Sequence, residues 1–134
     1  MFKGSYSVTI TPTSNDGKIK VKSLEKYFNW QIRKRIGGLI ILGSTGEFLS
    51  ISDDNRLKMI KESSSIIDKR VPLFVGTAAE NTYEAIRYSV EAQAQNADGA
   101  MIIPPFYSTP TPEELINHFR MISREIDIPI MVYN

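Results

Sequence analysis

The sequence has no cysteine and a single histidine among its 134 residues. The lack of cysteine excludes disulfides, thiolate zinc sites and a cysteine nucleophile. The formal net charge is only +1, with no long basic block, so the charge pattern favours neither nucleic acid nor a membrane surface as a partner. No apolar run approaches the roughly 20 residues that cross a bilayer, and the N-terminal stretch lacks a signal-peptide core. We therefore expect a cytoplasmic protein.

Hydrophobic residues make up 42% of the chain and charged residues 23%, which is typical of a globular protein of one domain. Five short runs rich in apolar and β-branched residues predict strands at 6–10, 39–42, 73–75, 100–103 and 130–133. The run at 39–42 is apolar at every position, which is typical of a strand buried on both faces of a parallel sheet.

Helical patterns separate these runs. We expect the helices to start at Ser23, at Ser52, at Asn81 with Glu84 as a capping box, and at Thr111-Pro112 with Glu114. The glycines at 37–38 are expected to stop the first helix. The predicted inward-facing residues are, helix by helix, Leu24, Phe28, Ile32 and Ile36; Leu57, Ile60 and Ile67; Tyr83, Ile86 and Val90; Leu115, Phe119 and Ile122.

Four side chains have no evident chemical role. We expect His118 on the exposed side of the last helix, and Tyr27, Phe28 and Trp30 in helix-on-strand packing.

The order of elements is strand and helix in alternation, with a repeat of about 30 residues, which indicates parallel strands joined by helical crossovers. Two architectures fit. One is an open, doubly wound sheet of five strands; the other is about half of an eight-stranded β/α barrel, which typically needs about 250 residues. No glycine-rich dinucleotide fingerprint follows the first strand, which favours the barrel.

Ligands bind at the carboxyl ends of the strands in either architecture. Those ends carry hydroxyls, glycines and two tyrosines, but no histidine and no paired carboxylates, which disfavours metal catalysis and glycosidase chemistry. At 43–47, Gly43 and Gly46 bracket Ser44 and Thr45 and predict a concave site for a carboxylate or phosphate. The alternative is a plain turn. We expect Glu47 to accept hydrogen bonds from the loop's amides rather than to act as a general base.

Three separated segments carry a resemblance: Gly43-Ser44-Thr45-Gly46-Glu47, Pro105-Phe106-Tyr107 and Val132-Tyr133-Asn134. Together with Gly4-Ser5 and Thr11-Pro12, they resemble the dihydrodipicolinate synthase / N-acetylneuraminate lyase family over the whole chain. The resemblance implies a (βα)8 TIM barrel, of which residues 1–134 form the N-terminal part, ending at the fifth strand, without a separate linker or second domain.

The resemblance also implies a class I aldolase, a lyase that holds pyruvate as a Schiff base on lysine. Ser44 and Thr45, with Gly43 and Gly46, would bind the pyruvate carboxylate. Tyr133 would donate and accept the proton, linked through the Ser44 hydroxyl to Tyr107, which in this family reaches into the neighbouring subunit. Such enzymes are homotetramers, dimers of dimers, and they need no metal or other cofactor because the lysine imine is the electron sink.

The family's Schiff-base lysine lies on the sixth strand, beyond Asn134. Lys18, Lys20 and Lys22 are expected in a polar loop, and the lysines at 58, 61 and 69 on the second helix, outside the barrel. None of them is expected to replace the missing nucleophile, so we expect the 134-residue chain alone to be inactive. The first candidate is a dihydrodipicolinate synthase, also called 4-hydroxy-tetrahydrodipicolinate synthase, which condenses pyruvate with an aldehyde in lysine biosynthesis. Alternatives are an N-acetylneuraminate lyase, in which serine occurs at position 44, and a 2-keto-3-deoxy sugar acid aldolase. A non-catalytic half-barrel is an alternative of another class.

A half-barrel would leave the first and fifth strands each with an unpaired edge. It would also leave the inner face of the second to fourth strands without the side chains that fill a barrel. We therefore expect the isolated chain to associate with itself or with a complementary half.

Overall fold

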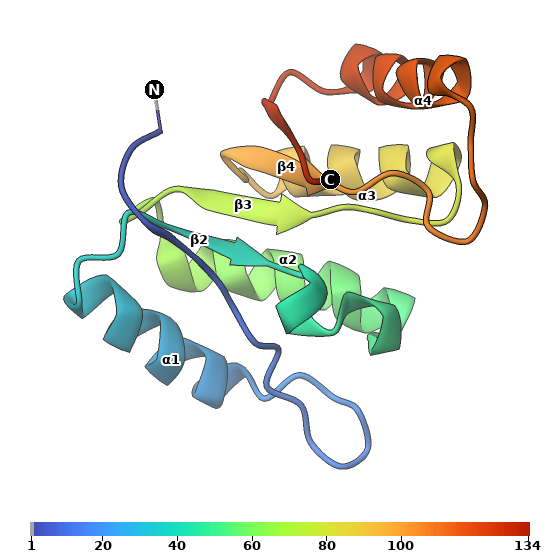
Figure 1. The fold of residues 1–134 in the computed structure, drawn as a ribbon. Coiled ribbons are helices and arrows are strands. Elements are labelled where there is room, and N and C mark those ends of the chain that lie inside the picture. Colours follow the sequence, from blue (N-terminus) through green and yellow to red (C-terminus); the bar gives the residue numbers. More distant parts are fainter. Residues whose placement is uncertain (1) are drawn as a thin grey trace.

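The computed structural model describes residues 2–134, which form five strands and four α-helices in strict alternation (Figure 1). The strands are β1 Tyr6–Val8, β2 Gly38–Ile41, β3 Leu73–Gly76, β4 Gly99–Ile102 and β5 Ile130–Val132. The helices are α1 Val21–Arg33, α2 Asp53–Ile67, α3 Thr82–Ala94 and α4 Pro112–Glu125, with two 3₁₀ turns, η1 Ser44–Gly46 and η2 Phe48–Ser50, between β2 and α2.

The strand order decides between the two predicted architectures. All neighbouring strands are parallel, and the order in the sheet is β1-β2-β3-β4-β5. An open doubly wound sheet reverses its strand order at a switch point, and this sheet has no reversal. Each helix instead packs on the next, α1 on α2, α2 on α3 and α3 on α4, as in the outer layer of a β/α barrel.

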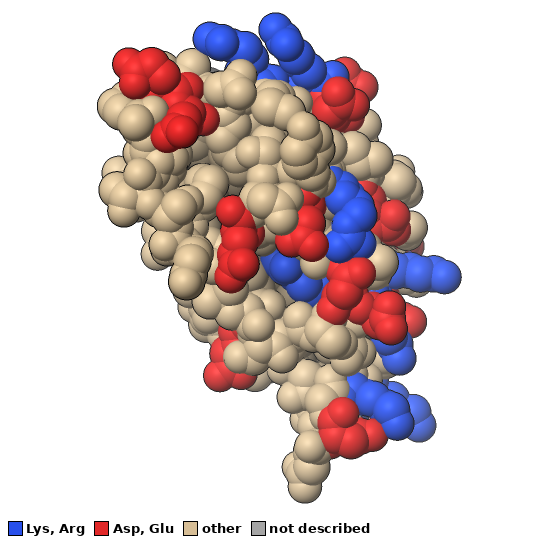
Figure 2. Space-filling view, turned by 90° about the vertical axis from the view of Figure 1, so that its right-hand side faces the viewer, with Lys and Arg blue, Asp and Glu red and all other residues tan. Residues whose placement is uncertain are grey.

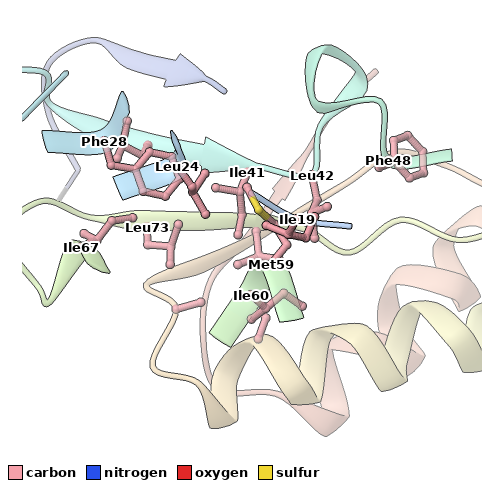
Figure 3. Close-up of a cluster of buried hydrophobic side chains, with 14 of the residues drawn as sticks. Ile19, Leu24, Phe28, Ile41, Leu42, Phe48, Met59, Ile60, Ile67 and Leu73 are labelled. Atoms are coloured by element: carbon pink, nitrogen blue, oxygen red, sulfur yellow. The ribbon is translucent and has the colours of Figure 1, made fainter. Parts of the chain in front are cut away.

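The main core lies between the sheet and the helices. Strand residues such as Ile41 and Leu73 meet Phe28 of α1 and Met59 of α2, all nearly inaccessible to solvent (Figure 3). A second cluster joins Ile102 of β4 to helical residues of α3 and α4. Each fully buried side chain of this size stabilises the fold by about 1.5–3 kcal/mol relative to exposure.

The opposite, inner face of the sheet carries a separate small cluster of Ile40, Phe74 and Met101, exposed by only 5%, 2% and 8%. The expectation that this face would lie open is wrong for these three residues. The ring of Phe2 lies edge-on to Phe74 at 4.9 Å between centroids, and that of Tyr6 at 5.8 Å. The N-terminal segment therefore covers the middle of the inner face.

Two of the predicted helix starts are confirmed as hydrogen-bonded caps. Thr111 and Glu114 form the complete capping box of α4, with Pro112 in the first turn. At α3 only one half of the predicted box is present: Asn81 Oδ1 accepts from the Glu84 amide at 2.9 Å. Helix α2 begins one residue after Ser52. Ser23, by contrast, lies inside α1, which starts at Val21 without a side-chain cap.

Helix α1 also ends earlier than the glycine pair predicts. Its last residue is Arg33, and Arg35 then takes a left-handed conformation with φ of 60° that turns the chain toward β2. Trp30 is 51% exposed, so its predicted packing on a strand is wrong, whereas Phe28 is fully buried as predicted. Tyr27 stacks on Trp30 at 6.3 Å and is half-buried.

The predicted stripe of α3 is wrong at two of its three positions. Tyr83 and Val90 are 76% and 41% exposed. The helix buries small residues instead, together with one tyrosine: Ala85, Tyr88, Ser89 and Ala92. Small side chains let the backbone of α3 approach its neighbours closely, so the largest apolar residues do not mark the buried face.

None of the helices within residues 2–134 is long and apolar enough to span a bilayer. Acidic and basic side chains both occur on the face shown in Figure 2, and neither sign forms a continuous patch there.

Candidate active site

The loop after β2 is shaped by a sharp reversal at the end of the strand. Leu42 adopts a left-handed conformation with φ of 55°, and its carbonyl oxygen lies over β3 at Gly76. A Cβ atom on Gly76 would lie 2.0 Å from that oxygen, so only glycine fits there. The reversal brings Gly43 to the carboxyl end of the sheet, where 3₁₀ turn η1 begins.

The other end of the loop is tied to the chain after β1. The Thr11 hydroxyl donates to the Gly46 carbonyl at 2.7 Å. A Cβ atom on Gly46 would approach Thr9 O to 3.0 Å and Thr11 Oγ1 to 3.2 Å, which leaves little room for any larger residue. Glu47, with φ of 55°, then turns the chain into η2.

Between these two ends, Ser44 and Thr45 meet Tyr133. The three residues line one cavity of about 230 Å³ at the carboxyl ends of the strands, together with Val8 and Met101. Tyr133 follows β5 directly, and its amide donates to Ile102 O at 2.9 Å, which holds it beside β4. The sequence predicted these positions, and the structure brings the three side chains together.

The loop offers several free hydrogen-bond donors at this cavity. The Gly46 and Glu47 amides donate within the loop, to Gly43 O and Ser44 O, both at 3.0 Å. Within residues 2–134, the amides of Ser44 and Thr45 donate to no backbone carbonyl. Two amides, two hydroxyls and a nearby phenol therefore suit a small carboxylate and a proton transfer next to it.

Two expected partners do not join this group. Tyr107 lies in the loop between β4 and α4, is 90% exposed and does not line the cavity. The expected relay from Ser44 to Tyr107 is therefore not formed within a single chain. No hydrogen bond joins Tyr133 to Ser44 in the part of the chain that the structure describes. Glu47 is exposed, and its carboxylate accepts no hydrogen bond there, so its expected role as acceptor for the loop's amides is wrong.

His118 is buried rather than exposed, which corrects the expectation from sequence. It is 3% exposed, and its Nδ1 lies 3.0 Å from the Thr82 hydroxyl of α3. Burial lowers the pKa of its imidazole. His118 lines a separate cavity of about 490 Å³ at the N-terminal ends of α3 and α4, with Asn117 and Glu114 among its other lining residues.

Arg56 is also buried, and the sequence patterns did not single it out. Its guanidinium lies between the rings of Phe48 and Tyr88, 5.2 and 4.1 Å from their centroids, and donates to Ala78 O at 2.8 Å. Tyr88 donates to Asp53, and Arg87 pairs with the same carboxylate, whose pKa is lowered mainly by the hydrogen bond from Arg87. Helical spacing could have predicted the burial of Arg56, because it lies three residues before Met59 and four before Ile60, both on the buried face of α2.

No group of three or more histidine, aspartate or glutamate side chains that could hold a metal ion occurs within residues 2–134.

Solved structures define the class of protein to which this fold and site belong. The chain superimposes on the dihydrodipicolinate synthase of Acinetobacter baumannii, solved with pyruvate, with a TM-score of 0.95 at 34% identity. The match covers 100% of this chain and 46% of that one. The N-acetylneuraminate lyase of Mycoplasma synoviae gives a TM-score of 0.92 at 28% identity, over 99% of this chain and 46% of that one. The five strands and their helices are thus the first half of a TIM barrel.

The model of the dihydrodipicolinate synthetase family matches residues 1–134, and the chain belongs to that family. Its curated relatives include the 4-hydroxy-tetrahydrodipicolinate synthase of Persephonella marina, which is 39% identical over all 134 residues and of which the match covers 45%. That of Acidiphilium cryptum is 35% identical with 46% covered. The chain therefore spans about half the length of the curated relatives it matches.

Proposed function

We propose that this chain is the N-terminal portion of a pyruvate-dependent, Schiff-base enzyme of the 4-hydroxy-tetrahydrodipicolinate synthase type, which condenses pyruvate with an aldehyde in the cytoplasm. The observation that carries the proposal is the meeting of Ser44, Thr45 and Tyr133 at one cavity. Family membership and the names of the relatives support it.

In this proposal the 43–47 loop holds the pyruvate carboxylate. The hydroxyls and free amides of Ser44 and Thr45 donate to the two carboxylate oxygens, and Gly43 and Gly46 give the loop the shape that presents them. Tyr133 then moves a proton to or from the reacting atoms, with the Ser44 hydroxyl as its relay.

Tyr107 completes the relay in a neighbouring subunit rather than in its own. Its 90% exposure, far above that of an ordinary packed tyrosine, supports a role across a subunit boundary. We propose further, from the family resemblance, that the full-length protein is a homotetramer built as a dimer of dimers.

The lysine that carries the imine lies beyond Asn134, in the second half of the barrel. A Schiff-base lysine needs a buried site that depresses its pKa. Every lysine within residues 2–134 is exposed, and none lines the cavity of Ser44 and Tyr133. The 134-residue chain alone is therefore inactive.

Borohydride trapping tests the proposal. The 134-residue chain, incubated with pyruvate and borohydride, should keep its mass, whereas a polypeptide that continues through the second half of the barrel should gain one pyruvyl adduct per chain. A stoichiometric adduct on a lysine of residues 1–134 would assign the nucleophile to this half. If the longer protein gains no adduct, the proposed function is rejected, and the alternative of a non-catalytic half-barrel remains.

The second candidate is an N-acetylneuraminate lyase or a 2-keto-3-deoxy sugar acid aldolase. The serine at position 44 favours it, and the Mycoplasma synoviae lyase shows that such a lyase shares this fold. Both candidates trap pyruvate, so substrate assays separate them. Condensation of pyruvate with an aldehyde supports the synthase, and release of pyruvate from N-acetylneuraminate or a 2-keto-3-deoxy sugar acid supports the lyase or aldolase.

A further inference from the structure

We infer that Thr11 is the positioning residue that holds the 43–47 loop in its carboxylate-binding shape. The inference rests on the proposed function, and it concerns a residue outside the cavity. Thr11 is half-buried and does not line the cavity of Ser44, Thr45 and Tyr133. Thr11 therefore affects substrate binding only through the position of the 43–47 loop.

The Thr11 hydroxyl makes the single side-chain hydrogen bond that reaches residues 43–47 from anywhere in the described chain. Its Oγ1 donates to the Gly46 carbonyl at 2.7 Å across 35 positions of sequence. The acceptor is the last residue of η1, directly after Ser44 and Thr45. A shift of this carbonyl would move the two residues that present hydroxyls and amides to the cavity.

The loop needs a restraint because both of its ends are strained. Leu42 and Glu47 are non-glycine residues with φ of 55°, a left-handed conformation that such residues adopt only when their surroundings enforce it. At the Leu42 end, the enforcing contact is the close fit of its carbonyl over Gly76. At the Glu47 end, the corresponding contact is the bond from Thr11 to Gly46.

Thr9 provides a matched control on the same segment. It is fully buried, and its hydroxyl also donates to a backbone carbonyl, Ile40 O at 3.2 Å. That bond ties β1 to β2 and does not involve the loop. A substitution that merely loosened the sheet would act at Thr9 as strongly as at Thr11, whereas a positioning effect belongs to Thr11 alone.

The test uses the full-length protein with three variants: Thr11→Val, Thr11→Ser and Thr9→Val. The pyruvate concentration that gives half-maximal borohydride trapping should rise about tenfold in Thr11→Val, the effect of one hydrogen bond, with little change in the maximal trapping rate. Thr11→Ser keeps the donor and should restore the wild-type value, and Thr9→Val should leave it unchanged. An unchanged value in Thr11→Val, or an equal rise in Thr9→Val, would overturn the inference.

Hydrogen exchange without pyruvate gives a second readout that is independent of catalysis. The amides of Gly46 and Glu47 should exchange faster in Thr11→Val than in wild type or Thr9→Val, while peptides from α4 serve as the reference for global opening. If the wild-type protein traps no pyruvate, the proposed function fails and exchange alone decides the role of Thr11. In that case, equal exchange rates of the loop amides in Thr11→Val and in the wild type would refute the positioning role of Thr11.

Discussion

Tyr133 brings a phenol to the cavity that Ser44 and Thr45 line. In the full-length protein, Tyr133→Phe should lower turnover by roughly 10²–10⁴-fold, the usual contribution of a positioned acid or base. The ring and its packing remain, so stability should change little. Steady-state kinetics measure the effect, with Tyr27→Phe on α1 as a control that should keep full activity. Wild-type turnover in Tyr133→Phe would reduce Tyr133 to a packing residue.

His118 is the single histidine of the chain, so its imidazole can be titrated by NMR without ambiguity in an untagged protein. Because burial disfavours the charged form, the pKa should lie below the usual value of about 6.5. A lowered folded-state pKa means that the neutral imidazole favours folding above pH ~6.5 and that this contribution is lost as the pH falls through the folded-state pKa.

Thr82→Val provides the control for this titration. It removes the hydroxyl beside Nδ1 but leaves the ring buried, so the pKa should stay low. A titration midpoint at or above that of a free histidine would show that the imidazole is solvated in solution.

Sequence patterns predicted that Ser44, Thr45 and Tyr133 lie at one edge of the sheet, because they lie at or just after the end of an apolar strand run and the ends of parallel strands meet at one edge. The burial of His118 was missed because a polar residue was assigned to the exposed side. Helical spacing could have predicted this burial, because His118 lies four residues before the fully buried Ile122, on the same face of α4. The contact between Thr11 and Gly46 joins residues 35 positions apart, and local pattern does not predict such a bond.

At the scale of elements, the start of α4 has the strongest local determinants. Thr111→Ala removes the acceptor for the Glu114 amide and should lower the free energy of unfolding by about 1 kcal/mol. Thr111→Ser keeps the hydroxyl and should lose little. Urea unfolding at a fixed protein concentration compares the two variants. Equal losses in both would mean that the methyl group of threonine matters, not the cap.

Sequence predicted the existence and order of all nine main elements, because alternation of apolar runs with capped helices is a strong signal. The sequence predicted less reliably which face of each helix is buried. In α3 the buried residues include Ala85, Ser89 and Ala92, whose small side chains carry little hydrophobic signal. Strand β2 ends one residue before the apolar run does, because the left-handed turn at Leu42 removes that residue from the ladder.

For the whole molecule, the decisive feature is a sheet with two edges. Strands β1 and β5 each pair with one neighbour only, within the sheet formed by the described residues. Val132 on β5 is 57% exposed and Val8 on β1 is 37% exposed. Unpaired edges with exposed apolar side chains invite another chain, so the 134-residue chain should form dimers or larger species.

Size-exclusion chromatography with light scattering tests this expectation. Val132→Lys places a charge on the β5 edge and should shift the population toward monomer, whereas Val90→Lys, an exposed position on α3, should not. A wild-type monomer that melts cooperatively would show that the half-barrel is stable by itself. The cover that Phe2 and Tyr6 give to the inner face would then account for that stability.

The unbroken strand order also bears on how the molecule is made. Within residues 2–134, each strand pairs with the one synthesised about 30 residues later, and with none further along this part of the chain. A polypeptide leaving the ribosome can thus add one strand–helix unit at a time to a sheet that is already in place. The growing edge is always the newest strand. Folding and translation would advance in the same direction, and a pause in synthesis would leave a shorter sheet of the same kind rather than a misassembled one.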